Sequence, residues 1–148
     1  MKEPMKNVNE TMMAAIFDVF EKMFYVFLEP VNDENPKYDM EASIHFNGVS
    51  QGEVKVLVSE QLAKVMVQNL LGLEGGDIAE KDTEDCVKEA ANIVCGNFLG
   101  KLDQTKVFDL STPTFSRSPG KAMPGDTVNI FNFDADGEGL GVILAMLN

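Results

Sequence analysis

The residues of this chain with the clearest chemical potential lie along one predicted helix, from about residue 81 to residue 103. Asp85, Glu89, Asn92 and Gly96 follow one another at intervals of four, three and four residues. Because an α-helix turns by about 100° per residue, these four positions fall on one face. Glu89 and Asn92, three residues apart, point the same way and can contact one bound group together. The opposite, apolar face carries Val87, Ala91, Val94, Phe98 and Leu102.

Gly96 also favours a functional role for the polar face of this helix. A glycine inside a helix costs about 1 kcal/mol relative to alanine, which suggests a packing or functional reason for it. With Ala90 and Ala91 nearby, it leaves the helix surface open to close approach. The plainer alternative is that Glu and Asn are residues that any solvent-facing helix carries. The position of these residues on one helix face therefore does not by itself distinguish a functional site from an ordinary surface.

Other candidate sites in the sequence are weaker. His45 is the one histidine, and Cys86 and Cys95 are the two cysteines, too few for a cysteine-rich zinc site. Nine residues apart on one helix, these cysteines are roughly 13 Å apart along its axis, too far for a disulfide, so we expect reduced thiols. The segment 134–139 lacks the ligand spacing of an EF-hand and predicts a hairpin turn. The segment 116–121 lacks the strand-to-helix context of a P-loop.

Composition excludes several classes of function. The 148 residues carry 12 basic and 24 acidic side chains, a formal net charge of −12, which repels nucleic acid and anionic lipid. It suits a partner with a basic patch, although acidity also serves solubility alone. No apolar run reaches the ~18 to 20 residues of a membrane helix, and the N-terminal MKEPMKNVNE is too polar for a signal peptide. We therefore expect a cytoplasmic protein, with residues 1–148 forming a single domain.

The remaining elements follow from periodicity and turn residues. Apolar spacing predicts a first helix from Met12 to about Leu28, capped by Asn9 or Thr11 and ended by Glu29-Pro30. A hairpin (39–46 and 53–59), a helix (60–71, ended by Gly72) and the helix 81–103 come next. Strands are expected at 106–115, 127–133 and 140–147, with a loop at 117–125. The predicted fold class is α/β (α+β), an antiparallel-rich mixed sheet with helices packed on it.

The segment Asp85 to Asn92 has the form D-x-x-x-E-x-x-N and resembles the signature helix of the CheC/CheX/FliY superfamily of chemotaxis phosphatases. The following residues 93–98, the hairpin glycines Gly48 and Gly52, and Pro113 downstream also resemble that family. Some members carry the E-x-x-N pair on two helices. Here Glu10 and Glu21 of the first helix are followed three residues later by Met13 and Phe24. One site is thus expected, as in the CheX branch, whose subunits join into a homodimer through the sheet.

The resemblance implies a phosphatase that hydrolyses the phospho-aspartate of a CheY-like response regulator. Asn92 would enter the regulator's active site and orient the attacking water, since a carboxamide offers a donor and an acceptor without negative charge. Glu89 would contact the regulator's lysine, and Asp85 and Gly96 would serve docking. The regulator would supply Mg²⁺, so no cofactor of this chain's own is expected.

Two other functions stay open on the sequence. A non-catalytic CheX-like module would bind a regulator, or scaffold a signalling or flagellar complex, without hydrolysis. The intact pair of Glu89 and Asn92 argues against it, because a pure scaffold has no need of both. A small-molecule sensor that uses the glycine-rich loops is the weaker alternative.

Overall fold

The computed structural model describes residues 7–32, 37–72, 78–103, 107–118 and 127–147. In chain order the elements are α1 (Val8–Lys22), β1 (Glu29–Pro30), β2 (Met40–Asn47), β3 (Gln51–Val58), α2 (Glu60–Leu71), α3 (Glu80–Leu102), β4 (Asp109–Leu110), β5 (Thr114–Ser116), β6 (Thr127–Ala135) and β7 (Glu138–Leu147). This is the predicted α/β class, with an antiparallel sheet and helices packed on it.

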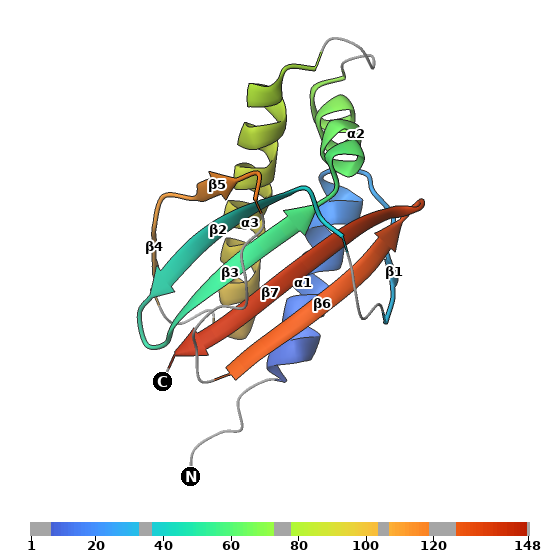
Figure 1. Cartoon of the computed structure of the whole chain (residues 1–148). Helices are drawn as coiled ribbons and strands as arrows, with labels where there is room; N and C mark the ends of the chain where they lie inside the picture. Colours follow the sequence, from blue (N-terminus) through green and yellow to red (C-terminus); the bar gives the residue numbers. More distant parts are fainter. Residues whose placement is uncertain (1–6, 33–36, 73–77, 104–106, 119–126, 148) are drawn as a thin grey trace.

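The strands form one seven-stranded sheet in the order β1-β6-β7-β3-β2-β4, and β5 also pairs with β2. All the pairings are antiparallel. Figure 1 shows α1 and α3 side by side against one face of this sheet, with α2 beyond one end, and none of the described helices covers the other face. The short strands β1 and β4/β5 therefore mark two opposite edges.

The core lies between the sheet and the two long helices. In β2, Met40, Ala42, Ile44 and Phe46 point inward and are buried, as the period of two requires. The ring of Phe46 meets the ring of Phe98 in α3 edge-on, with 6.5 Å between centroids. This contact fixes α3 against β2, and so sets the position of the polar face that α3 turns outward.

The first helix differs from the sequence prediction at both ends. α1 begins at Val8, where the Asn7 side chain, rather than Asn9 or Thr11, accepts hydrogen bonds from the amides of Asn9 and Glu10. It ends at Lys22 rather than Leu28, because Tyr25 adopts a left-handed conformation with φ of 56°. The apolar pattern continues past the helix end because the chain stays buried there without being helical, at Phe24, Val26 and Leu28.

The predicted strand 106–115 is wrong as a single element. The structure has β4 and β5 instead, both paired to β2, with residues 111–113 between them. Pro113 lacks an amide donor and so cannot continue a strand ladder. By contrast α2 has the predicted bounds, because Ser59 caps its start and Gly72 ends it in the left-handed region.

Candidate active site

The helix α3 presents the predicted polar face. Asp82 accepts a hydrogen bond from the Ala79 amide at its start, with 3.1 Å between the atoms. The predicted apolar positions Val87, Ala91, Val94 and Phe98 are buried, whereas Leu102 is only partly buried. On the other side Asp85, Glu89 and Gly96 are exposed and Asn92 is half-buried. The division of the helix into two faces is thus confirmed.

A shallow depression of about 440 Å³ lies over this face. One wall is α3, with Asp85, Lys88, Glu89 and Asn92, and the other is the connection from β4 to β5, with Ser111, Thr112 and Pro113. The structure thus brings together three of the four residues predicted from the helix. Gly96 does not line the depression. It lies one turn beyond Asn92, and a β-carbon added to it would meet no atom within 4 Å.

The second wall is fixed by the sheet. The Ser111 amide donates to the His45 carbonyl, and the Ser111 hydroxyl accepts from the His45 amide, both at 2.9 Å. This bond pair extends the β2–β4 pairing by one residue and holds the chain beside α3. Sequence reasoning missed Lys88, Ser111 and Thr112 as part of the site. The only signal near the second wall was Pro113, which was noted as a family position.

Glu89 and Asn92 are available to a partner. Within the described part of the chain, neither side chain makes a hydrogen bond or an ion pair. Asp85 differs, because its carboxylate lies 3.5 Å from Lys81 Nζ and 3.8 Å from Lys88 Nζ. The depression therefore offers one free carboxylate and one free carboxamide, side by side on a rigid helix. Such a pair can receive a cation and orient a water molecule.

The remaining sequence candidates lie elsewhere. His45 is exposed, with Nε2 at 3.5 Å from Glu53 Oε1, and does not line the depression. A hairpin turn lies within the predicted segment 134–139, as the two residues Asp136 and Gly137 between β6 and β7, both at positive φ. Of the segment 116–121, residues 119–121 lie outside the described residues. Across the described ranges, no three or more His, Cys, Asp or Glu are grouped to hold a metal.

The two cysteines are free, as predicted, and the structure shows in addition that both are buried. Burial raises the pKa of the Cys86 thiol to about 12, and the nearby Glu89 charge acts in the same direction. Burial raises the pKa of Cys95 to about 12 as well. Both are therefore neutral packing residues at physiological pH.

Among the described helices, none is long and apolar enough to cross a membrane.

A protein-family model covers the helix that carries the candidate site. The family model "Chemotaxis phosphatase CheX" matches residues 40–131, which include β2, β3, α2 and the whole of α3. No curated protein matches the sequence significantly.

Solved structures share the fold over almost the whole chain. The CheX protein of Vibrio vulnificus superimposes with a TM-score of 0.78 at 20% identity, covering 98% of this chain and 99% of its own. The CheX of Desulfovibrio desulfuricans gives 0.76 at 23%, with 94% and 98% covered. A Borrelia burgdorferi CheX, solved in complex with CheY, BeF3 and Mg²⁺, gives 0.76 at 21%, with 96% and 99% covered.

Proposed function

The chain belongs to the chemotaxis phosphatase CheX family, and we propose that it hydrolyses the phospho-aspartate of a CheY-like response regulator with Glu89 and Asn92. The observation that carries this proposal is the free carboxylate and carboxamide three residues apart on α3, open to a partner above the depression. A phosphatase acting on a protein needs such an open face, since its substrate is itself a folded domain.

In the proposed mechanism, Asn92 enters the active site of the regulator and holds a water molecule in line with the phosphorus. The water oxygen forms a bond to phosphorus as the bond to the aspartyl oxygen breaks, which gives inorganic phosphate and a free aspartate. A carboxamide suits this task because it orients water through a donor and an acceptor. Positioning is the main contribution that protein side chains make to phosphoryl transfer.

Glu89 is proposed to set the register of docking. Its carboxylate has no partner among the described residues, so a regulator lysine can form a charge-assisted bond to it. Asp85 is held by Lys81 and Lys88, and we assign it to the shape and charge of the docking face. Gly96 lets the regulator approach α3 closely.

The proposal includes the metal and the assembly. Mg²⁺ would come with the regulator, and the Borrelia burgdorferi complex contains CheY, BeF3 and Mg²⁺ together with CheX. We also propose a cytoplasmic homodimer joined through the sheet, in which each copy keeps its own α3 face, and a single domain spanning residues 1–148.

The test is phosphate loss from a phosphorylated CheY-like regulator, with and without this protein. Asn92→Ala should abolish the acceleration and Glu89→Gln should weaken it through a raised KM. Asn9→Ala and Glu84→Gln, outside the depression, are the matched controls and should keep full activity. Binding of the regulator with an unaltered phosphate lifetime would favour the non-catalytic scaffold instead. Unchanged activity in Asn92→Ala would refute the proposed role of that residue.

A further inference from the structure

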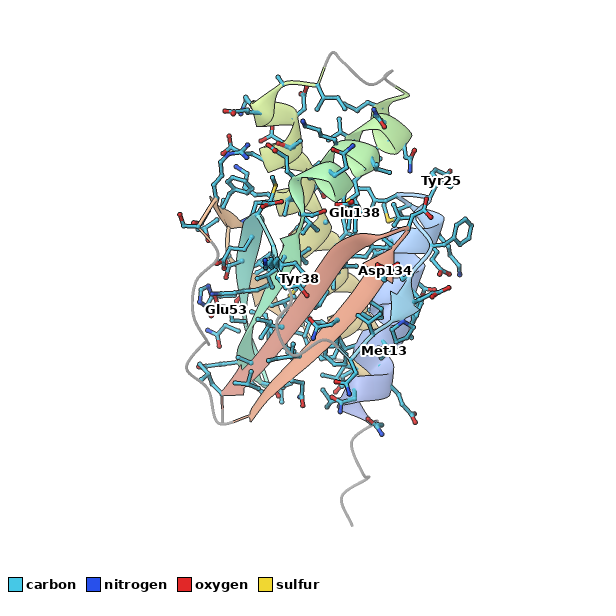
Figure 2. All side chains as sticks on the ribbon, turned by 45° about the vertical axis from the view of Figure 1, so that its right-hand side comes forward. Met13, Tyr25, Tyr38, Glu53, Asp134 and Glu138 are labelled. Carbon is cyan, nitrogen blue, oxygen red and sulfur yellow. The ribbon has the colours of Figure 1, made fainter. Side chains whose placement is uncertain are left out.

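A second groove, of about 530 Å³, lies at the opposite edge of the sheet from the candidate active site. It is formed by the connection from α1 to β1, by β1, by α2 and by the β6–β7 hairpin. Figure 2 labels three of its residues, with Asp134 and Glu138 on β6 and β7 and Tyr25 beyond them at the right. A regulator docked on α3 beside β5 would leave this groove free.

Two aromatic rings at the groove are largely in water. Tyr25 is 66% exposed and Phe27 is 78% exposed. Asn69 of α2 donates to the carbonyl of Phe24 at 2.9 Å and thereby fastens the segment that carries them. The groove thus presents aromatic surface on a fixed backbone, as protein-binding sites do.

The groove also gathers four carboxylates, from Glu29, Asp134, Asp136 and Glu138. Glu29 and Asp134 stand directly opposite each other in the β1–β6 register. Like charges at such positions destabilise a sheet. Within the described part of the chain, none of the four forms an ion pair with a lysine or arginine. A guanidinium or ammonium group from a partner would relieve this repulsion, so the arrangement favours binding of such a group.

Some of these carboxylates are already oriented. Asp134 accepts from the Gly137 amide at 3.1 Å, and Glu138 accepts from the Ser59 hydroxyl at 2.7 Å. Glu29 and Asp136 make no hydrogen bond through their side chains among the described residues. They are the two carboxylates most available to a bound cation.

We propose that this groove docks a segment of a partner protein in which arginine or lysine alternates with apolar side chains. A guanidinium can bind a carboxylate bidentately and stack on an aromatic ring, and the groove offers both kinds of surface. A bound small ligand usually has roughly 70–90% of its surface buried. Tyr25 and Phe27 are too exposed to enclose a small ligand in this way. A second copy, also carrying −12, is a poorer source of cationic groups.

The first experiment measures binding of a fluorescein-labelled nonapeptide of alternating arginine and leucine by fluorescence anisotropy. The double variant Glu29→Gln/Asp136→Asn should bind at least about tenfold more weakly than the wild type. Asparagine tolerates the left-handed backbone at position 136, so the fold should persist. The matched control Glu10→Gln/Asp109→Asn removes the same charge at exposed positions outside the groove and should change affinity less than twofold.

Three further results would overturn the proposal. Equal weakening of peptide binding in both double variants would mean that the net charge of the protein alone attracts the peptide. Binding of N-acetyl-arginine amide as tight as that of the peptide would indicate a small-cation site. Loss of self-association in the Glu29→Gln/Asp136→Asn variant, measured by sedimentation, would assign the groove to a second copy. Phe27→Ala should also weaken binding of the peptide severalfold. An unchanged affinity would mean that the aromatic rings do not contact the bound segment.

The groove and the phosphatase site can be tested separately. The Glu29→Gln/Asp136→Asn variant should dephosphorylate a regulator at the wild-type rate, because these residues lie at the other edge of the sheet. Asn92→Ala should bind the peptide as the wild type does. Failure of either function therefore leaves the other one testable.

Discussion

Asp18 of α1 and Lys101 of α3 form an ion pair between the two helices that cover the sheet, with 2.8 Å between Oδ2 and Nζ. Asp18 also lies 3.3 Å from Lys22 within its own helix. The hydrogen bond from Lys101 is the main cause that holds the pKa of Asp18 below its ordinary value, and burial opposes it. The pair therefore joins the end of α3, the helix of the site, to its neighbour.

Asp18→Asn should lower the free energy of unfolding at pH 7 by roughly 0.5 kcal/mol, the usual scale of a partly exposed pair. Because folding lowers the pKa of Asp18, its contribution is complete above the ordinary value of 3.8 and is lost as the pH falls through the lower, folded value. Urea unfolding at pH 7 and below pH 3.8 should thus show the two proteins converging in acid. The same gap at both pH values would contradict this assignment.

Tyr38 and Gly141 depend on each other on the face of the sheet opposite α1 and α3. A β-carbon on Gly141 would lie 2.7 Å from the Tyr38 hydroxyl oxygen, which itself donates to Asn132 Oδ1 at 2.6 Å. Figure 2 shows Tyr38 in front of the sheet. Gly141→Ala should therefore destabilise the protein by about 1–2 kcal/mol, because the ring must move.

In a Tyr38→Ala background the same change should be neutral or stabilising, since glycine weakens a strand interior. A double-mutant cycle of unfolding free energies measures this coupling. Additive effects of the two substitutions would show that the ring and the glycine are independent. Gly139→Ala, where the nearest Tyr38 atom is 3.3 Å away, serves as the milder comparison.

Cys86 and Cys95 should resist alkylation in the folded protein. Burial raises the pKa of each thiol to about 12, so almost no thiolate exists at pH 8. Iodoacetamide should label both cysteines quickly in urea and very slowly in buffer, as followed by intact mass. Because folding raises these pKa values above 9.0, stability should decline as the pH rises above that value. Rapid labelling in buffer would mean that α3 opens from the sheet.

The sequence predicted elements best where local and tertiary signals coincide. The helix α2 has its predicted bounds and ends at Gly72 as expected, and the two faces of α3 follow from its periodicity. The same apolar periodicity misled at the end of α1, because Phe24 is buried without being helical. No local rule places a tyrosine in the left-handed region, so the turn at Tyr25 could not be foreseen.

The site was predictable on one side only. Glu89 and Asn92 lie on one helix, and their spacing alone puts them together. The opposite wall comes from strand pairing: Ser111 reaches the depression because it bonds to His45, 66 residues away in the chain. A pairing between residues so far apart in the chain produces no periodic pattern in the sequence from which it could be predicted. The groove beside Tyr25 was missed for the same reason, since it forms where β1 meets β6.

Gly96 provides the sharpest test of the docking face. Nothing lies within 4 Å of a β-carbon added there, or of one added to Gly100, so Gly96→Gln and Gly100→Gln should both stabilise α3 by up to about 1 kcal/mol. Gly96 lies one turn from Asn92 and Gly100 lies two. If a regulator packs closely over Gly96, its substitution alone should raise KM about tenfold while kcat stays within about twofold. Regulator titrations with both variants measure this difference, and an unchanged KM in Gly96→Gln would place the contact elsewhere on α3.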